Sequence, residues 1–156
     1  MAILVKLDDI IDGMESQSDE SYAFLDKRTG EVILINDYEI RAAENNNPIE
    51  DFPEWEHELI KTAKEIIAET SNYISLPSKY DINEYGIIED FCWSIKNTKI
   101  RDIFYDLIKG SGAIRRFRDA LFRHGIEDDW HQYRSKALRE IAIEWCQEHG
   151  IDFDDE

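Results

Sequence analysis

The sequence predicts an α+β fold in which a small antiparallel sheet, made of a hairpin and a third strand, packs with a mainly helical C-terminal half. Three observations lead to this class. Two β-rich runs flank a turn sequence near residue 26, a short apolar run ends at Pro77, and apolar residues recur at helical spacing from residue 81 onward. A chain of 156 residues fits one domain, which we expect to span residues 1–156.

The hairpin is the best-defined local element. The stretch SYAFLDKRTGEVILI holds β-rich runs at 22–25 and 31–35 on either side of DKRTG. Asp26 suits the first position of a type I turn, and Gly30 can take the left-handed conformation of a bulge. The run YISLP at 73–77 is too short for a helix that must end before its proline, so we expect it to join the hairpin's sheet.

Residues typical of helix starts occur at three places in the first part of the chain. Two of them lie in the N-terminal part, residues 1–50, and the third follows directly after it. A short strand at 3–7 precedes the first of them. In chain order, the residues that suit a first helical turn are Asp8 or Asp9, Asn36 or Asp37, and Asp51 with Pro53. The third of these helices would extend to about Thr70 and carry Trp55 on its apolar stripe.

The helical part, residues 51–150, continues with four more helices after the third strand. Asp81 and Glu84 have the spacing of a capping box, and Asn97 or Thr98 suits the start of the next helix. The residues expected to end the last three helices are Gly110, Gly125 and Gly150. We expect residues 151–156 to be a frayed acidic tail.

The charge of the chain is strongly acidic and unevenly spread. With 18 basic and 35 acidic residues, the net charge is −17. Residues 1–78 hold 6 basic and 18 acidic residues, whereas residues 96–123 hold 8 basic and 3 acidic ones. The overall charge repels nucleic-acid phosphates and anionic membranes at long range, and it favours solubility, basic partners or cations.

The sequence predicts a cytoplasmic protein without cofactor, metal or membrane span. Cys92 and Cys146 have no paired spacing, which argues against a disulfide or zinc site. No histidine lies three or four residues from another, and no run approaches the ~20 apolar residues of a membrane helix. Cys146 and His149 are three residues apart, but both cysteines lie in apolar stripes, which indicates buried and inert thiols.

The stretch GSGAIRRFRD at 110–119 stands out from this acidic background. The candidate binding residues here and further along the same helix are Gly112, Arg115, Arg116, Arg118 and Arg123. Backbone N–H groups at a helix start can hold a phosphate or carboxylate, and arginines can add charge-assisted hydrogen bonds. The stretch lacks the Lys-Ser/Thr ending of a phosphate-binding loop and follows a helix, so that mode of nucleotide binding is not expected.

Two interpretations of these arginines stay open. In the structural one, which we expect, they pair with the chain's own acids while Ala113, Ile114 and Phe117 face the core. In the functional one, they bind a partner. Arg115, Arg118 and Phe122 can share one helix face, and a basic face with an aromatic residue suits single-stranded nucleic acid.

Three stretches carry more specific patterns: the hairpin YAFLDKRTGEVILI, the corner GSGAIRRFRDAL and the last segment DDWHQYRSKALREIAIEWCQEHGI. In this order along nearly the whole chain, they resemble a widespread bacterial family of uncharacterised proteins. Its most specific patterns are YxxLDxxTGEV and GxGAxRRF, followed by Trp-x-x-Tyr. The family has phenylalanine where this chain has Ile114, and the region 43–72 has no clear counterpart. The resemblance implies one compact domain in a bacterial cytoplasm and carries over no catalytic residue.

These observations lead to three hypotheses about function. The first is a non-enzymatic domain that binds another macromolecule, namely a protein. The second is a nucleic-acid-associated regulator that uses the basic helix 110–123. The third is an enzyme whose site is assembled only in space, because no G-x-S-x-G, H-E-x-x-H or G-x-G-x-x-G motif occurs in the sequence.

Overall fold

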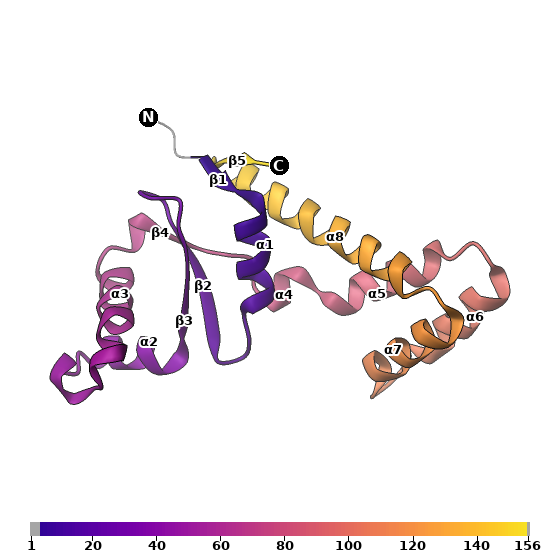
Figure 1. Ribbon diagram of the computed structural model, residues 1–156, viewed down its shortest axis with the longest axis horizontal. Coiled ribbons are helices and arrows are strands. Elements are labelled where there is room, and N and C mark those ends of the chain that lie inside the picture. The colour runs from indigo at the N-terminus through magenta and orange to yellow at the C-terminus, as the bar shows by residue number, and fades with distance from the viewer. Residues whose placement is uncertain (1–3, 156) are drawn as a thin grey trace. The chain divides into compact units, whose positions relative to one another are not determined.

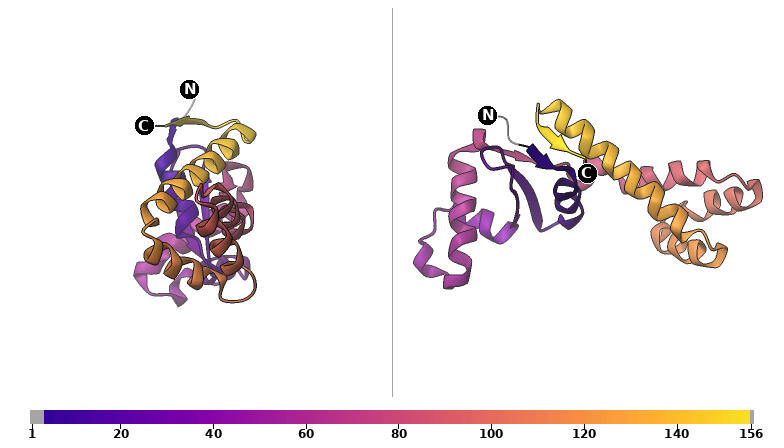
Figure 2. Two further views of the ribbon diagram at one scale, coloured as in Figure 1. Left: turned by 90° about the vertical axis from the view of Figure 1, so that its right-hand side faces the viewer. Right: turned by 45° about the horizontal axis from the view of Figure 1, so that its top comes forward.

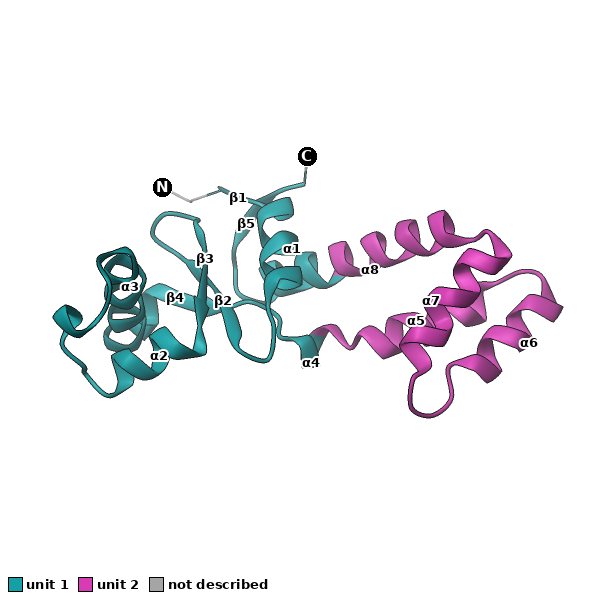
Figure 3. Ribbon diagram, turned by 60° about the horizontal axis from the view of Figure 1, so that its bottom comes forward, with its two compact units in different colours: residues 1–81, 141–156 teal, residues 82–140 magenta. Residues whose placement is uncertain are grey.

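The computed structural model describes residues 4–155 and has the predicted α+β architecture (Figure 1). Two compact units divide the chain (Figure 3). The sheet unit comprises residues 1–81 and 141–156, and the helical unit comprises residues 82–140. Helix α8, Glu127–Glu148, has residues in both units. The single domain expected from the sequence stays a prediction.

A three-stranded antiparallel sheet with the order β3-β2-β4 forms the centre of the sheet unit. Its strands are β2 (Ser21–Asp26), β3 (Val32–Asn36) and β4 (Tyr73–Ser75). The predicted hairpin and third strand are therefore confirmed. Gly30 has a φ of 78°, and its N–H donates to the carbonyl of Asp26 over 2.8 Å, which closes the turn as expected.

Helices cover both faces of this sheet (Figures 1 and 2). On one face lie α2 (Asp37–Glu44) and α3 (His57–Ala68), and on the other lies α1 (Leu7–Ser16). The core toward α2 and α3 is formed by Ile35, Ala43, Ala63, Ile66 and Tyr73. Alternate residues of each strand face opposite sides of a sheet, so both layers can bury apolar side chains.

Gly13 allows α1 to pack closely on its face of the sheet. A Cβ atom at this position would lie 2.7 Å from Val32 Cγ1 and 2.8 Å from Leu76 Cδ2. These distances are too short for real carbon contacts, so a larger residue would force α1 or the side chains of Val32 and Leu76 to shift.

The two ends of the described chain pair as parallel strands. In this sheet β1 (Leu4–Lys6) runs beside β5 (Asp152–Asp154), with Val5 opposite Phe153 (Figure 1). The expectation of a frayed acidic tail is therefore wrong for residues 152–154. Backbone pairing and the apolar ring of Phe153 overcome the preference of the flanking acids for solvent.

Of the predicted helix starts in the sheet unit, the one at Asn36 is confirmed and the first one differs by a residue. Asn36 caps α2 as expected, in a capping box with Glu39: its Oδ1 accepts from Glu39 N over 3.1 Å, and Glu39 Oε2 accepts from Asn36 N over 2.9 Å. The first helix starts at Leu7, one residue before the predicted caps Asp8 and Asp9, which lie in its first turn.

The third predicted helix is present as α3, but its predicted start at Asp51 is wrong, because α3 starts only at His57. Ahead of it lie two 3₁₀ turns, η1 (Ile49–Asp51) and η2 (Glu54–Glu56). Phe52 between them is extended, as expected for a residue that precedes a proline. Trp55 consequently lies outside the apolar stripe and is 74% exposed. A third 3₁₀ turn, η3 (Thr70–Asn72), leads into β4.

The helical unit contains α5 (Glu84–Ser94), α6 (Thr98–Leu107), α7 (Ala113–His124) and the first part of α8. The short helix α4 (Lys79–Ile82) precedes α5. Asn97 caps α6 as predicted, through hydrogen bonds from Lys99 N and Ile100 N.

The predicted capping box of Asp81 and Glu84 is wrong. Asn83 caps α5 instead, because its Oδ1 accepts from Gly86 N over 3.2 Å. Its φ of 52° is a left-handed conformation that asparagine tolerates better than most residues. The carboxylate of Asp81 faces Ser78, whose N–H and hydroxyl both donate to it.

Asp26 anchors the turn of the hairpin by an ion pair with Arg28. Its buried carboxylate accepts hydrogen bonds from Arg28 N at 2.9 Å, Nε at 3.1 Å and Nη2 at 3.2 Å. The same guanidinium reaches Glu65 on α3 at 2.6 Å and the Tyr73 hydroxyl on β4 at 2.8 Å. Burial alone would raise the pKa of Asp26, but the hydrogen bonds and charge of Arg28, with Thr29 N–H, hold it below its usual value.

We expect Asp26→Asn to lower the free energy of unfolding by about 2 kcal/mol at pH 7, because the ion pair and its charged hydrogen bonds are lost. A lowered native pKa stabilises the fold fully above the ordinary aspartate pKa of ~3.9. The gap between wild type and variant should therefore close as the pH falls through and below this value. Urea unfolding between pH 7 and pH 3 measures it, with Asp19→Asn on an exposed turn as the control. A gap of constant size would contradict the assignment.

Candidate binding site of the helical unit

Helix α7 starts at a glycine corner, as the sequence predicts. Gly112 occupies the N-cap position with a φ of 76°, in the left-handed region. A Cβ atom there would also lie 3.1 Å from Arg116 Nη1. Glycine is favoured at this position because it adopts the conformation without strain and leaves room for that guanidinium.

Arg116 binds the last residue of α6 and two residues of the α6–α7 connection rather than an acid. It donates from Nε to the carbonyl of Leu107 at 2.9 Å, from Nη1 to that of Ser111 at 2.6 Å, and from Nη2 to that of Lys109 at 2.6 Å. The last carbonyls of a helix have no partner within the helix. Arg116 therefore stabilises the α6–α7 connection and is unavailable to a ligand in this conformation.

The other three arginines of α7 point away from the core. The side chains of Arg115, Arg118 and Arg123 are exposed and form no hydrogen bond or ion pair with any residue from 4 to 155. The expected pairing with the chain's own acids is thus absent from the described part of the chain. A basic face is left on α7.

Ile114 was expected in the core and is 45% exposed instead. It shares the outer face of α7 with Arg118 and Phe122, each one turn further along. The inner face is formed by Ala113, Phe117, Ala120 and Leu121. Ile114 lies three residues before Phe117 and seven before Leu121, a spacing typical of a core stripe, which explains the wrong prediction.

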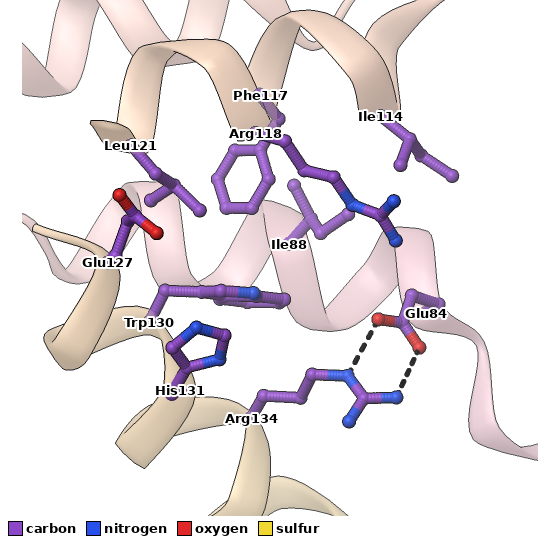
Figure 4. A pocket seen from close by; sticks show the side chains of 10 residues that line it. All are labelled: Glu84, Ile88, Ile114, Phe117, Arg118, Leu121, Glu127, Trp130, His131 and Arg134. Carbon is purple, nitrogen blue, oxygen red and sulfur yellow. Dashed lines mark hydrogen bonds and ion pairs between the residues drawn. The ribbon is translucent and has the colours of Figure 1, made fainter. Parts of the chain in front are cut away.

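A groove of about 480 Å³ lies between α5, α7 and α8 (Figure 4). Its apolar floor is formed by Ile88, Phe117, Leu121 and Trp130. The ring centroids of Phe117 and Trp130 are 4.9 Å apart at 84°, an edge-to-face contact that holds α7 against α8. Both rings are buried, so the floor is a fixed surface.

The rim of the groove carries charges that differ between its two ends (Figure 4). At one end, Arg134 donates from Nε and Nη2 to the carboxylate of Glu84 at 2.8 and 3.2 Å. Arg118 extends toward this end from α7, with no partner of its own among residues 4–155. At the other end lies Glu127, and His131 lies in front of Trp130. The groove therefore offers one unsatisfied guanidinium beside an apolar floor.

Most residues of this groove could not be predicted from local sequence patterns. Of the predicted binding residues, only Arg118 lines the groove. Glu84 and Arg134 are 50 positions apart, so their ion pair could not be read from spacing. Trp130 belongs to the Trp-x-x-Tyr pattern of the final helix, which was the one available indication.

Both cysteine thiols are buried, as the sequence indicates. Burial raises the pKa of Cys92 to about 11, with a smaller contribution from the charge of Glu89. Burial also raises the pKa of Cys146 to about 11. Neither thiol lines the groove, and both are protonated near neutral pH.

From residue 4 to residue 155, no three or more histidine, cysteine, aspartate or glutamate side chains are grouped so that they could hold a metal ion. Within the same range, no helix has the length and apolar character needed to cross a membrane.

We expect Arg116→Ala to lower the free energy of unfolding by about 2 kcal/mol, because three carbonyls lose a charged donor. Arg115→Ala is the matched control. The neighbouring arginine has no partner among residues 4–155 and should change stability by about 0.5 kcal/mol or less. Urea unfolding of the two variants measures the difference. Equal effects would contradict the structural role of Arg116.

We expect both cysteines to react slowly with a thiol reagent in the native protein. A pKa of about 11 leaves roughly a hundredfold less thiolate at pH 8 than an ordinary cysteine has. Absorbance assays with an aromatic disulfide reagent should detect almost no fast thiol in the folded chain and two per chain in guanidinium. One fast native thiol would identify an activated cysteine and contradict this expectation.

Comparison with known proteins identifies the family of this chain but assigns it no function. No curated protein and no solved structure is significantly similar to this chain. One family model matches residues 1–156, and it describes an uncharacterised protein family. The resemblance noted from the hairpin and the glycine corner is confirmed by this match. The chain therefore belongs to the uncharacterised protein family UPF0158.

Proposed function

We propose that the helical unit is a protein-binding domain. Its groove would hold a short segment of a partner protein, with an apolar side chain on the floor and a carboxylate facing Arg118. The single observation that carries this proposal is the guanidinium of Arg118, which lacks a partner among residues 4–155 and lies beside a fixed apolar floor. A free arginine next to buried aromatic rings is a common arrangement at protein interfaces.

The size of the groove favours a segment of chain over a broad globular surface. About 480 Å³ is within the usual 300–1,000 Å³ range of ligand pockets and accommodates one or two large side chains. Because Phe117 and Trp130 are already in contact, the floor needs little ordering when a ligand binds.

The polarity of the rim supports one orientation of the segment. A carboxylate is favoured near Arg118, where Glu84 is already neutralised by Arg134. At the other end, Glu127 disfavours a second carboxylate. We therefore expect an acidic residue to lie on only one side of the apolar anchor.

The charge distribution also favours the helical unit over the sheet unit as the place where an acidic segment would bind. The helical unit has 11 basic and 10 acidic residues, whereas the rest of the chain has 7 and 25. An acidic partner would therefore be repelled by the sheet unit and much less by the helical unit. This difference favours the helical unit as the binding surface.

Selection of a displayed library of 12-residue peptides on the full chain tests this proposal. Recovered peptides should combine an aliphatic or aromatic residue with an acid on one side. Fluorescence anisotropy then measures their affinity. Arg118→Glu should weaken binding about tenfold or more, because attraction becomes repulsion. Arg123→Glu, on the same helix but outside the groove, is the matched control and should change affinity less than about twofold.

Two outcomes would contradict the proposal. One is the recovery of basic peptides, or of none. The other is an equal loss in the two charge-reversal variants, which would place binding on the whole basic face of α7. If single-stranded nucleic acid bound with equal dependence on Arg115, Arg118 and Arg123, the regulator hypothesis would replace the proposal.

A further inference from the structure

A second surface of the helical unit presents two neighbouring aromatic rings to solvent. Trp93 near the end of α5 is 59% exposed, and Tyr105 on α6 is 36% exposed. Their ring centroids are 5.0 Å apart, and the planes are tilted by 59°. Neither residue lines the groove. Two large rings that contact each other and remain exposed form an apolar patch outside the core.

A cation lies over each ring. The guanidinium of Arg101 is 6.0 Å from the centre of the Trp93 ring, and Lys109 Nζ is 4.7 Å from that of Tyr105. We call Trp93, Arg101, Tyr105 and Lys109 the cation–aromatic surface. Its aromatic centre and its flanking cations come from two helices, α5 and α6, and from the α6–α7 connection.

The charge around this surface is positive despite the acidity of the whole chain. Residues 93–109 hold four basic residues, of which Lys96 and Lys99 are exposed and unpaired among residues 4–155. The two acids in this stretch are Asp102 and Asp106, and Asp106 Oδ1 lies 3.5 Å from Lys109 Nζ. This exposed pair is weak, so Lys109 can turn to another anion at small cost.

We propose that the cation–aromatic surface binds single-stranded nucleic acid, with an unpaired base stacked on Trp93 and adjacent phosphates contacted by Arg101 and Lys109. Exposed rings interleaved with cations are what single strands bind, because every base has a face that can stack. This activity goes beyond the proposed peptide binding and uses none of the groove residues.

The geometry favours a single strand over a duplex. Base faces are buried in a duplex, so an exposed indole could not stack on them. Binding a duplex would then rest on phosphate contacts alone, and the net charge of −17 opposes such binding. We therefore expect binding of modest affinity. With two phosphates contacted, the logarithm of affinity should fall with that of salt concentration at a slope of about −1.4.

Fluorescence anisotropy of a labelled 12-nucleotide single-stranded RNA of mixed sequence, at 50 mM salt, tests this proposal on the full chain. Trp93→Ala should weaken binding about tenfold. Trp55→Ala is the matched control, because Trp55 is also highly exposed but lies in the sheet unit, and it should leave affinity unchanged. The double variant Arg101→Gln/Lys109→Gln should flatten the salt dependence.

Several outcomes would overturn the proposal. They are the absence of binding at 50 mM salt, equal affinity for the same sequence as a duplex, and equal effects of the Trp93 and Trp55 variants. Arg118→Glu, in the groove, separates the two proposals. It should leave RNA affinity unchanged, and Trp93→Ala should leave peptide affinity unchanged. Thermal unfolding of each variant checks that the fold is intact, which the exposure of both tryptophans leads us to expect.

Discussion

The helical unit depends on the packing of one ring, that of Phe117. Its centroid lies 6.1 Å from Phe91, 5.9 Å from Phe104 and 4.9 Å from Trp130, so a single side chain of α7 contacts the other three helices. This contact fixes the rotation of α7 about its axis. Arg116 is thereby directed toward the carbonyl of Leu107 and those of the α6–α7 connection, and Arg118 toward the groove. The different roles of two nearby arginines follow from the position of one buried phenylalanine between them.

A feature could be predicted from the sequence when the residues that determine it lie close together along the chain. The hairpin, the Asn36 cap and the strand before Pro77 depend on residues a few positions apart, and they were predicted correctly. The groove depends on three helices, and its ion pair joins Glu84 to Arg134 across 50 positions. The prediction for Ile114 was wrong for another reason. The spacing of Ile114 from Phe117 and Leu121 fits the buried stripe, but the residue lies at the exposed edge of that stripe.

The two proposed binding surfaces both present basic side chains of the helical unit but would recognise ligands by different physical interactions. In the groove, a fixed apolar floor selects shape and a single guanidinium selects charge. On the cation–aromatic surface, exposed rings accept any planar partner, and the cations add little selectivity. The acidity of the sheet unit limits the affinity of either surface for polyanions and so suppresses non-specific association.

The parallel pairing of β1 with β5 also determines the order in which the parts of the chain can be completed. The helical unit is one continuous stretch that ends at residue 140, whereas the sheet unit is interrupted by it. Val5 finds its partner strand only when Phe153 has been synthesised. During translation, all residues of the helical unit are thus made before the sheet unit can close its second sheet. The first strand therefore stays without its partner until residues 152–154 have been made, and an unpaired strand edge is open to premature contacts.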